Sequence, residues 1–214
     1  MSPNVPRLRR YFTRNPMQPL TDTDIILEAY RAALAARAPL PAGDWALLRP
    51  LLEVVAVPRG GGTLREGSVC RFIDHVHQGA FRAWHHRDGL EVSTGLYTEG
   101  DLVTDMASLS TGAPAATTLE AVEDAVVVRL YKERLTDAYR HSTGLQALGR
   151  ALLEAMVAAE QAWRPLQTMY DAAERYRFLQ QQAPGWMARF PVAYIASFLG
   201  MRRETLSRLR GRRG

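Results

Sequence analysis

The stretch PVAYIASFLGMRRETLSRLRGRRG, residues 191–214, combines a regular apolar spacing with a run of arginines. Ile195 and Leu199 are four residues apart, and Leu206 and Leu209 are three apart, so each pair lies on one face of a helix. Gly200 stands between the two pairs, and glycine suits a turn that needs a positive φ. The spacing therefore predicts two short helices that pack on each other across a tight turn, a helix-turn-helix.

The positive charge of the chain is concentrated in this stretch. The whole chain has 27 basic and 22 acidic residues, a formal net charge of +5, and residues 201–214 hold six arginines and one glutamate, which also gives +5. Arginine can donate two hydrogen bonds to a guanine edge, glutamate can accept one from cytosine, and further arginines can neutralise phosphates. The candidate DNA contacts on the outward face of the second helix are Arg202, Arg203, Glu204, Ser207, Arg208 and Arg210. A solvated basic tail would not need the apolar spacing, so the pattern favours a DNA-recognition helix.

Upstream of this stretch, the residue pattern first predicts helices and then short strands. Residues 20–53 carry apolar side chains at helical spacing, and Pro39 and Pro41 divide them into two predicted helices. From Val54 to Tyr131, short β-rich pieces alternate with turn residues, and Asp88-Gly89 between two of them is a hairpin signal. Several short strands at close spacing predict a small antiparallel barrel or roll.

A long helix is predicted after Lys132. Apolar and small residues recur three and four apart in a seam formed by Leu145, Leu148, Leu152, Ala155, Ala159, Ala162 and Leu166. Such a seam packs either on the chain's own barrel or on a second copy in a two-fold dimer, and the pattern favours the dimer. A further helix follows, and Pro184-Gly185 ends it.

The composition excludes several classes of protein. Hydrophobic residues make up 47% of the chain, enough for a core, and no apolar stretch is long enough to cross a bilayer. The basic N-terminus has no apolar run after it, so it is not a secretory signal, and we expect a cytoplasmic protein. Cys70 is the only cysteine, which excludes an intrachain disulfide, an iron–sulfur cluster and a cysteine-type zinc site within one chain. The chain has no P-loop, GxGxxG stretch or catalytic-triad spacing, so we expect neither an enzyme nor a cofactor.

From about Leu27 to Arg210, the order of these predicted elements resembles the Crp/Fnr family of bacterial transcription regulators. Glycines fall at the turn positions of that family, namely Gly67, Gly79, Gly89 and Gly100. In RRETLSR, residues 202–208, an Arg-Glu-Thr sequence followed by an arginine is similar to the family's recognition sequence. The resemblance implies that Arg203, Glu204 and Arg208 read base edges of double-stranded DNA. It also implies a homodimer and admits RNA polymerase as a further partner.

The resemblance implies an α+β fold in four parts. These are an N-terminal arm over residues 1–24, a β-roll effector-type domain over 25–137, a long dimerisation helix over 138–167 and a helix-turn-helix DNA-binding domain over 168–214. Members of the family usually continue past the recognition helix into a β-hairpin wing, whereas the sequence ends at Gly214. We therefore expect a helix-turn-helix without a full wing, in which Arg210, Arg212 and Arg213 substitute for the phosphate contacts of the wing.

The effector region departs from the family pattern. Nucleotide-binding members carry a cassette that begins with Gly-Glu and ends with Arg-Ser or Arg-Thr, and its arginine neutralises the cyclic phosphate. Aligned from Gly100-Asp101, the opening pair here is Thr104-Asp105 and the closing pair is Ala115-Ala116. A buried phosphate without a cationic partner is costly to desolvate. We therefore predict that cyclic AMP and cyclic GMP do not control the protein, and that any effector bound by these four residues is of another kind.

Two histidines on a predicted strand raise a rival interpretation. His75 and His77 point to one face, as in the metal motif of cupin-like β-roll proteins, and the helix-turn-helix would then be vestigial. The usual cupin motif needs a carboxylate shortly afterwards, and residues 78–82 contain none. The sequence therefore favours histidines that are exposed or hydrogen-bonded on a sheet, and we expect no metal site.

Overall fold

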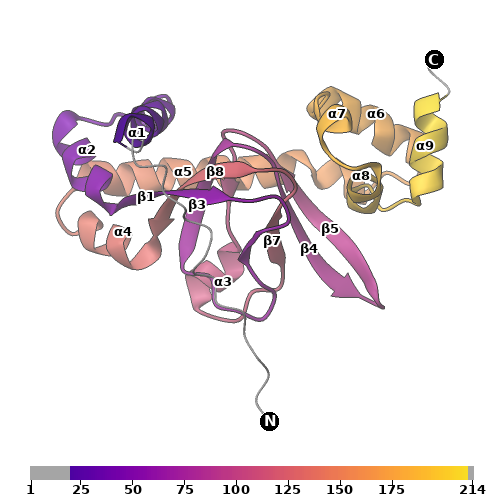
Figure 1. Ribbon diagram of the computed structural model, residues 1–214, viewed down its shortest axis with the longest axis horizontal. Helices are drawn as coiled ribbons and strands as arrows, with labels where there is room; N and C mark the ends of the chain where they lie inside the picture. The colour runs from indigo at the N-terminus through magenta and orange to yellow at the C-terminus, as the bar shows by residue number, and fades with distance from the viewer. Residues whose placement is uncertain (1–19, 212–214) are drawn as a thin grey trace, which may run out of the picture.

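The computed structural model describes residues 20–211, which form a β-roll with helices at both ends (Figure 1). Most of the predicted arm, residues 1–19, and the two arginines Arg212 and Arg213 lie outside the described residues. The strands are β1 (Leu52–Val57), β2 (Gly62–Leu64), β3 (Phe72–Gln78), β4 (Phe81–Arg87), β5 (Leu90–Tyr97), β6 (Leu102–Val103), β7 (Thr118–Ala121) and β8 (Ala125–Tyr131). The helices up to the end of the roll are α1 (Leu20–Ala35), α2 (Ala42–Leu48), the 3-10 turn η1 (Arg49–Leu51) and α3 (Met106–Thr111). After the roll come α4 (Lys132–Tyr139), α5 (Thr143–Ala162), the 3-10 turn η2 (Arg164–Gln167), α6 (Ala172–Gln182), α7 (Trp186–Arg189), α8 (Val192–Phe198) and α9 (Arg203–Gly211).

The strands form two antiparallel sheets that face each other. One has the strand order β1-β8-β3-β6 and the other β2-β7-β4-β5. The turn from β4 to β5 is the predicted hairpin, and both Asp88 and Gly89 have the positive φ of a type I′ turn. Gly79, between β3 and β4, is required for another reason, because a Cβ there would lie 2.4 Å from the Cβ of Ala125. The α+β roll predicted from the sequence is confirmed.

The space between the two sheets is filled by apolar side chains. This roll core includes Val76, Phe81, Val103, Leu119 and Val127, none of which exposes any of its surface. Side chains alternate between the two faces of a strand, so the next residue of β8, Val128, points the other way. It belongs to a second core that packs α1, α2, α4 and α5 on the outside of the first sheet.

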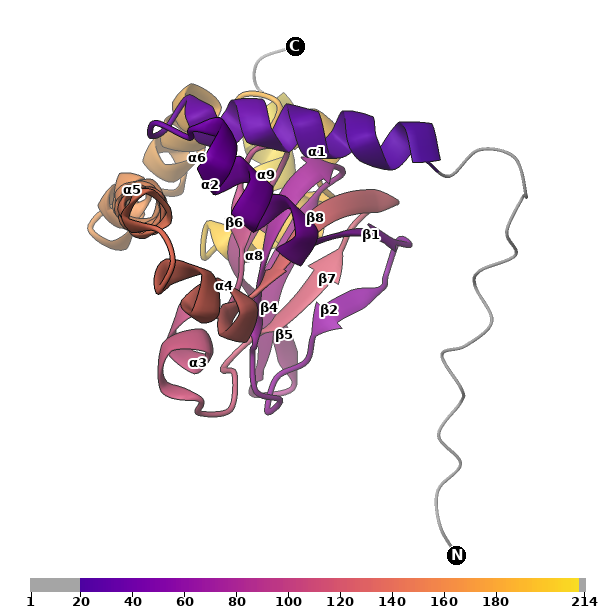
Figure 2. The same cartoon turned by 90° about the vertical axis from the view of Figure 1, so that its left-hand side faces the viewer.

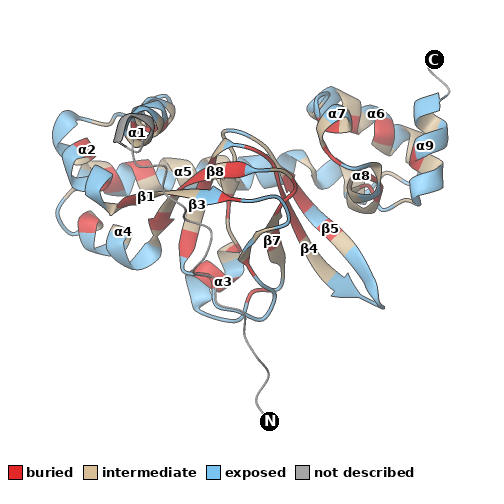
Figure 3. Cartoon of the chain, viewed as in Figure 1, coloured by how far each residue is buried: buried red, intermediate tan, exposed pale blue. Residues whose placement is uncertain are grey.

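Helix α5 is the long helix of the sequence analysis, but it is shorter than residues 138–167. Ser142 begins it, since its hydroxyl accepts a hydrogen bond from the amide of Leu145, and Pro165 lies in the 3-10 turn that follows it. Leu145 and Leu148, the first two seam residues, are buried in the second core. The first turns of the seam therefore pack within the chain, while the middle of α5 is exposed (Figure 3).

Two local predictions were wrong. The second helix was expected to reach residue 53, but β1 begins at Leu52, where pairing with Leu130 of β8 extends the backbone. Helix α3 and the short strands β2 and β6 were not predicted at all. Asp105 caps α3 and Gly112 ends it with a φ of +76°, and these two residues were the available signals.

His75 is a buried residue of β3, and its ring packs against Tyr30 of α1. Figure 2 views the molecule from the end at which α1 and α2 lie. The ring of His75 lies 4.7 Å from the ring of Tyr30, and neither ring nitrogen has a hydrogen-bond partner within the described part of the chain. Burial, assisted by the positive charge of Arg37 and by His77, lowers the pKa of His75 to about 4. The imidazole is therefore neutral at pH 7.

We expect this histidine to make the fold acid-sensitive. In the unfolded chain a histidine titrates near 6.5. Below that pH the unfolded state therefore binds a proton on this histidine, whereas the native state stays unprotonated until the pH falls much lower. The free energy of unfolding should therefore fall by about 2 kcal/mol between pH 7 and pH 5. Urea denaturation of wild type and His75→Leu at both pH values measures it.

His141→Leu, in the exposed turn before α5, is the matched control and should keep the wild-type dependence on pH. A His75→Leu protein with the same pH dependence as wild type would contradict the assignment.

Candidate nucleic-acid interface

The C-terminal helices α8 and α9 pack through the apolar positions that the sequence indicated. Ile195 and Leu206 expose none of their surface, and Leu199 exposes 1%. They share a third core with Tyr176 and Leu179 of α6. One face of each helix is therefore buried, and the opposite face of α9 is exposed to solvent.

The turn between the two helices is tightly held. Gly200 has a φ of +63°, and the amide of Met201 donates to the carbonyl of Ala196 at 2.9 Å. Arg175 of α6 donates to the carbonyl oxygens of Leu199 at 2.8 Å and of Met169 at 2.8 Å. A Cβ at Gly200 would lie 2.9 Å from the end of the Arg175 side chain, which can move, so it is the positive φ that favours glycine here.

All six predicted DNA contacts are exposed. They lie on one end of the molecule, on α9 and the residue before it (Figure 3), and comprise Arg202, Arg203, Glu204, Ser207, Arg208 and Arg210. Within residues 20–211, none of these side chains forms an ion pair or a hydrogen bond with the protein. Glu204 in the first turn and Arg208 and Arg210 in the last also suit the helix dipole. The charges of α9 are therefore free to meet an external partner.

The four predicted effector residues lie close together at the start of α3, but they form a hydrogen-bonded turn. The Asp105 carboxylate accepts from the amides of Ser108 at 2.9 Å and Ala116 at 3.0 Å, and from the Thr117 hydroxyl at 3.3 Å. The Thr104 hydroxyl donates to the carbonyl of Phe72 at 2.8 Å. The amide of Ala115 donates to the carbonyl of Ser68 at 2.8 Å, and Ala115 is buried.

The charged group of these four residues is the Asp105 carboxylate, which already accepts hydrogen bonds from the amides at this position. Two cavities, one at the turn between α4 and α5 and one beside Trp84, are lined by other residues. The polar groups of the predicted pocket are thus engaged by the protein itself.

A buried ion pair lies nearby and was not identified from the sequence. Arg129 of β8 donates to both carboxylate oxygens of Asp74 on β3, at 2.7 Å each, and its guanidinium lies 3.8 Å from the ring centre of Phe72. Burial raises the pKa of Asp74, and Arg129 opposes that shift. Because the two residues sit 55 positions apart and meet only through strand pairing, no local pattern could have revealed them.

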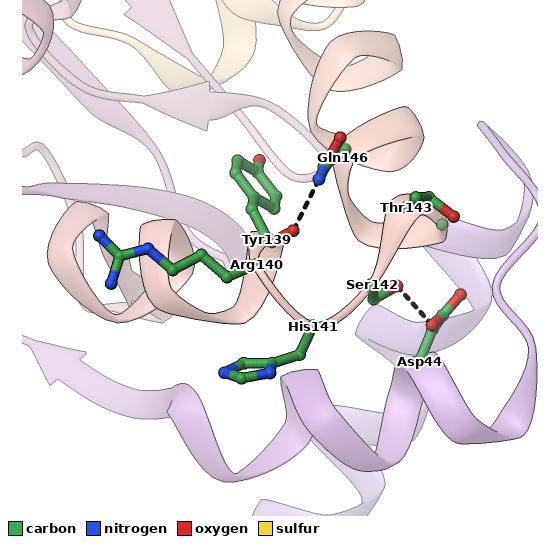
Figure 4. Close-up of a pocket in the computed structure, with 8 residues that line it drawn as sticks. Asp44, Tyr139, Arg140, His141, Ser142, Thr143 and Gln146 are labelled. Carbon is green, nitrogen blue, oxygen red and sulfur yellow. Dashed lines mark hydrogen bonds between the residues drawn. The ribbon is translucent and has the colours of Figure 1, made fainter.

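The larger cavity, of about 530 Å³, lies at the turn between α4 and α5 (Figure 4). The hydroxyl of Ser142 donates to Asp44 at 2.6 Å, and His141 points away from both (Figure 4). Serine, histidine and aspartate are close in space here, but no histidine stands between the other two. The Asp44 carboxylate instead supports the N-terminus of α5, where a negative charge is favourable.

The described residues also hold no group of three or more histidine, cysteine, aspartate or glutamate side chains that could bind a metal ion. None of the helices described is long and apolar enough to cross a membrane.

Comparison with known proteins identified one matching domain model and several solved structures with a similar fold. A model of the cyclic nucleotide-binding domain matches residues 55–142. FixK2 of Bradyrhizobium japonicum has a TM-score of 0.61 at 20% identity, over 75% of this chain and 83% of that chain. The catabolite activator protein of Thermus thermophilus has a TM-score of 0.51 at 20% identity, over 84% of this chain and 85% of that one. The c-di-GMP responsive global regulator CLP of Xanthomonas campestris has a TM-score of 0.61 at 17% identity, over 80% and 91%.

No curated protein matches the sequence of the chain. The match and the shared architecture nevertheless agree with each other and with the resemblance indicated by the sequence. Residues 55–142 match the model of a cyclic nucleotide-binding domain, and the chain shares its overall fold with these three solved structures.

Proposed function

We propose that this protein is a sequence-specific DNA-binding transcription regulator of the Crp/Fnr type, which acts in the cytoplasm as a homodimer. The observation that carries the proposal is the exposed face of α9, whose three arginines and one glutamate, with Arg202 just before the helix, have no partner within residues 20–211. Leaving several charges unpaired on a helix that is otherwise tightly held is what a groove-reading helix needs.

The chemistry of each side chain suggests its role on DNA. Arg203 and Arg208 would each donate two hydrogen bonds to a guanine, and Glu204 would accept one from a cytosine. Arg202 and Arg210 lie beside them, where they would neutralise phosphates and hold the helix in register. Ser207 would donate to or accept from either kind of group.

The exposed middle of α5 supports a two-fold dimer. Leu153 exposes 48% of its surface and Val157 exposes 46%, and they are four residues apart on one face. An isologous contact between two copies would cover this face. Two recognition helices related by a two-fold axis read half-sites about 34 Å apart, one turn of DNA, so the operator would be a pseudo-palindrome. RNA polymerase is the partner such a regulator would influence.

The turn at Asp105 supports regulation without cyclic nucleotides. The carboxylate would repel a cyclic phosphate, and the guanidinium of Arg129 is bound to Asp74. The rival function, a metal-binding cupin-like roll with a vestigial helix-turn-helix, has no observation in its favour, since His75 is buried against Tyr30.

DNA recognition is tested by selecting genomic fragments with the full-length protein without added ligand. Wild type should recover a two-fold symmetric motif, and Arg203→Ala/Arg208→Ala should not, since each lost bidentate contact costs about 1–3 kcal/mol of discrimination. Arg177→Ala, an exposed arginine on α6, is the matched control and should recover the wild-type motif.

If wild type and the double variant bound specific and random DNA equally, the base-reading assignment would be wrong. If neither recovered any motif while both were folded dimers, the proposed function itself would fail.

The dimer contact is tested with Leu153→Glu/Val157→Glu. Two buried carboxylates facing their copies would be strongly unfavourable, so the variant should be monomeric at micromolar concentrations by sedimentation velocity, whereas wild type should be dimeric. Ala158→Glu, on the same helix but about 100° around from Val157, should remain dimeric. A dimeric double variant would place the interface elsewhere.

Cyclic AMP and cyclic GMP are expected to leave the thermal unfolding temperature unchanged at millimolar concentration. A ligand at 100 times its Kd would stabilise the native state by about 2.7 kcal/mol, which calorimetry resolves readily. A rise in Tm with either nucleotide would show that the Asp105 turn opens to admit it.

A further inference from the structure

The helix-turn-helix is held on the β-roll by contacts between segments about 100 residues apart in the chain. Helix α8 lies beside strand β5 (Figure 1), and the amide of Ser93 donates to the hydroxyl of Ser197 at 2.9 Å. That hydroxyl in turn donates to the carbonyl of Glu91 at 3.3 Å. The backbone edge of β5, which has no strand beyond it, is therefore covered by the first helix of the pair.

Arg82 of β4 lies beneath this contact and is 2% exposed. Its guanidinium lies 3.8 Å from the ring centre of Tyr194 on α8, and it pairs with Glu91 at 2.6 Å and with Glu120 at 3.3 Å. A buried arginine is retained only where its charge is compensated. Two carboxylates of the roll supply the compensation, and the ring of α8 covers the guanidinium.

A second arginine makes the reciprocal connection at the other end of the contact. Arg189, the last residue of α7, donates to Glu99 after β5 and to Glu123 between β7 and β8. The hydrogen bond from Arg189 lowers the pKa of Glu99 to about 2. The pair is consequently charged across the whole physiological range of pH.

Apolar side chains fill the space between these polar contacts. Ala80, Leu96 and Val122 of the roll belong to the same buried cluster as Ile195 and Leu206 of the helix pair. Polar and apolar contacts together form the docking interface, which comprises Ala80, Arg82, Ser93, Leu96, Glu99, Val122 and Glu123 on the roll, and Arg189, Tyr194 and Ser197 on the C-terminal helices.

We propose that Arg82 and Arg189 are positioning residues, through which the β-roll fixes the orientation of α9 relative to α5. The inference rests on the proposed function, because a fixed orientation matters only if two copies of α9 read one operator. Along the chain, α5 is joined to the helix pair α8 and α9 through η2, α6 and α7. Trp163, which stacks on Trp186 with ring centres 4.8 Å apart, supports one side of that connection, and the docking interface supports the other.

The consequence is a strict requirement for half-site spacing. One added base pair moves a half-site by about 3.4 Å and rotates it by about 35°, which rigidly held helices cannot follow. A protein whose helix pair is released from the roll keeps the same side chains on α9 but tolerates altered spacing.

The test uses Arg189→Gln/Tyr194→Ala, which removes the two side chains of the helices that contact the charged groups of the roll and leaves every residue of the roll in place. The matched control is Arg177→Gln/Tyr170→Ala, the same substitutions at two exposed positions of the C-terminal part. Affinity is measured on the selected operator and on versions with one base pair removed and with one or two added between the half-sites.

Wild type and the control should lose at least about tenfold in affinity for each altered spacing. Arg189→Gln/Tyr194→Ala, the docking variant, should lose less than about threefold, with its base preferences unchanged. A docking variant that lost as much affinity as wild type on the altered spacings would overturn the inference. A docking variant that bound the original operator more tightly would overturn it as well, since the interface would then oppose DNA binding.

Hydrogen exchange of the free dimer provides a readout that does not depend on DNA. The amide of Ser93 is protected by Ser197, so the docking variant should exchange it at least about tenfold faster than wild type and the control. Unchanged protection of Ser93 would overturn the inference. A wild type that recovers no operator, with the expected change in exchange, would remove the proposed function and leave the docking itself established.

Discussion

The structure depends on a single strand that is buried on both faces. β8 pairs with β1 on one side and β3 on the other, so its backbone is satisfied within the sheet. Its Val127 enters the roll core, whereas the adjacent Val128 enters the core beneath α1, α2, α4 and α5. The two cores consequently share one backbone and cannot shift independently. The position of α4 and of the first turns of α5 is therefore fixed against this strand.

The parts of the fold that the sequence predicted are those encoded by local spacing. The helix pair, the hairpin at Asp88-Gly89 and the alternation of strands each depend on residues that lie within a few positions of each other in the sequence. The start of β1 was missed because Leu52 is extended by pairing with a strand almost 80 residues later. Helix α3 was missed because six mostly small and polar residues show no apolar stripe. The exposure of all six candidate residues could be predicted, since it follows from the inward positions of the apolar residues; their contact with DNA stays a prediction.

The turn at Asp105 shows how a side chain that the sequence offered for an effector can be engaged within the fold. The Asp105 carboxylate accepts hydrogen bonds from the amides of Ser108 and Ala116. The sequence indicated the missing cation, while the use of the carboxylate as a helix cap and as an acceptor for Ala116 required the structure. Fold alone therefore says little about what the roll recognises.

The placement of charge has a kinetic consequence. Residues 201–214 carry the whole formal excess of +5, and α9 lies at the end of the molecule remote from α1 and α2 (Figure 1). The protein is thus an electric dipole with a nearly neutral body. If the protein binds DNA as we propose, the arginine-bearing end would be attracted to a duplex within the roughly 8 Å over which physiological salt leaves charges unscreened. That attraction would turn the molecule toward the groove before any base is contacted, so that fewer encounters would fail for wrong orientation.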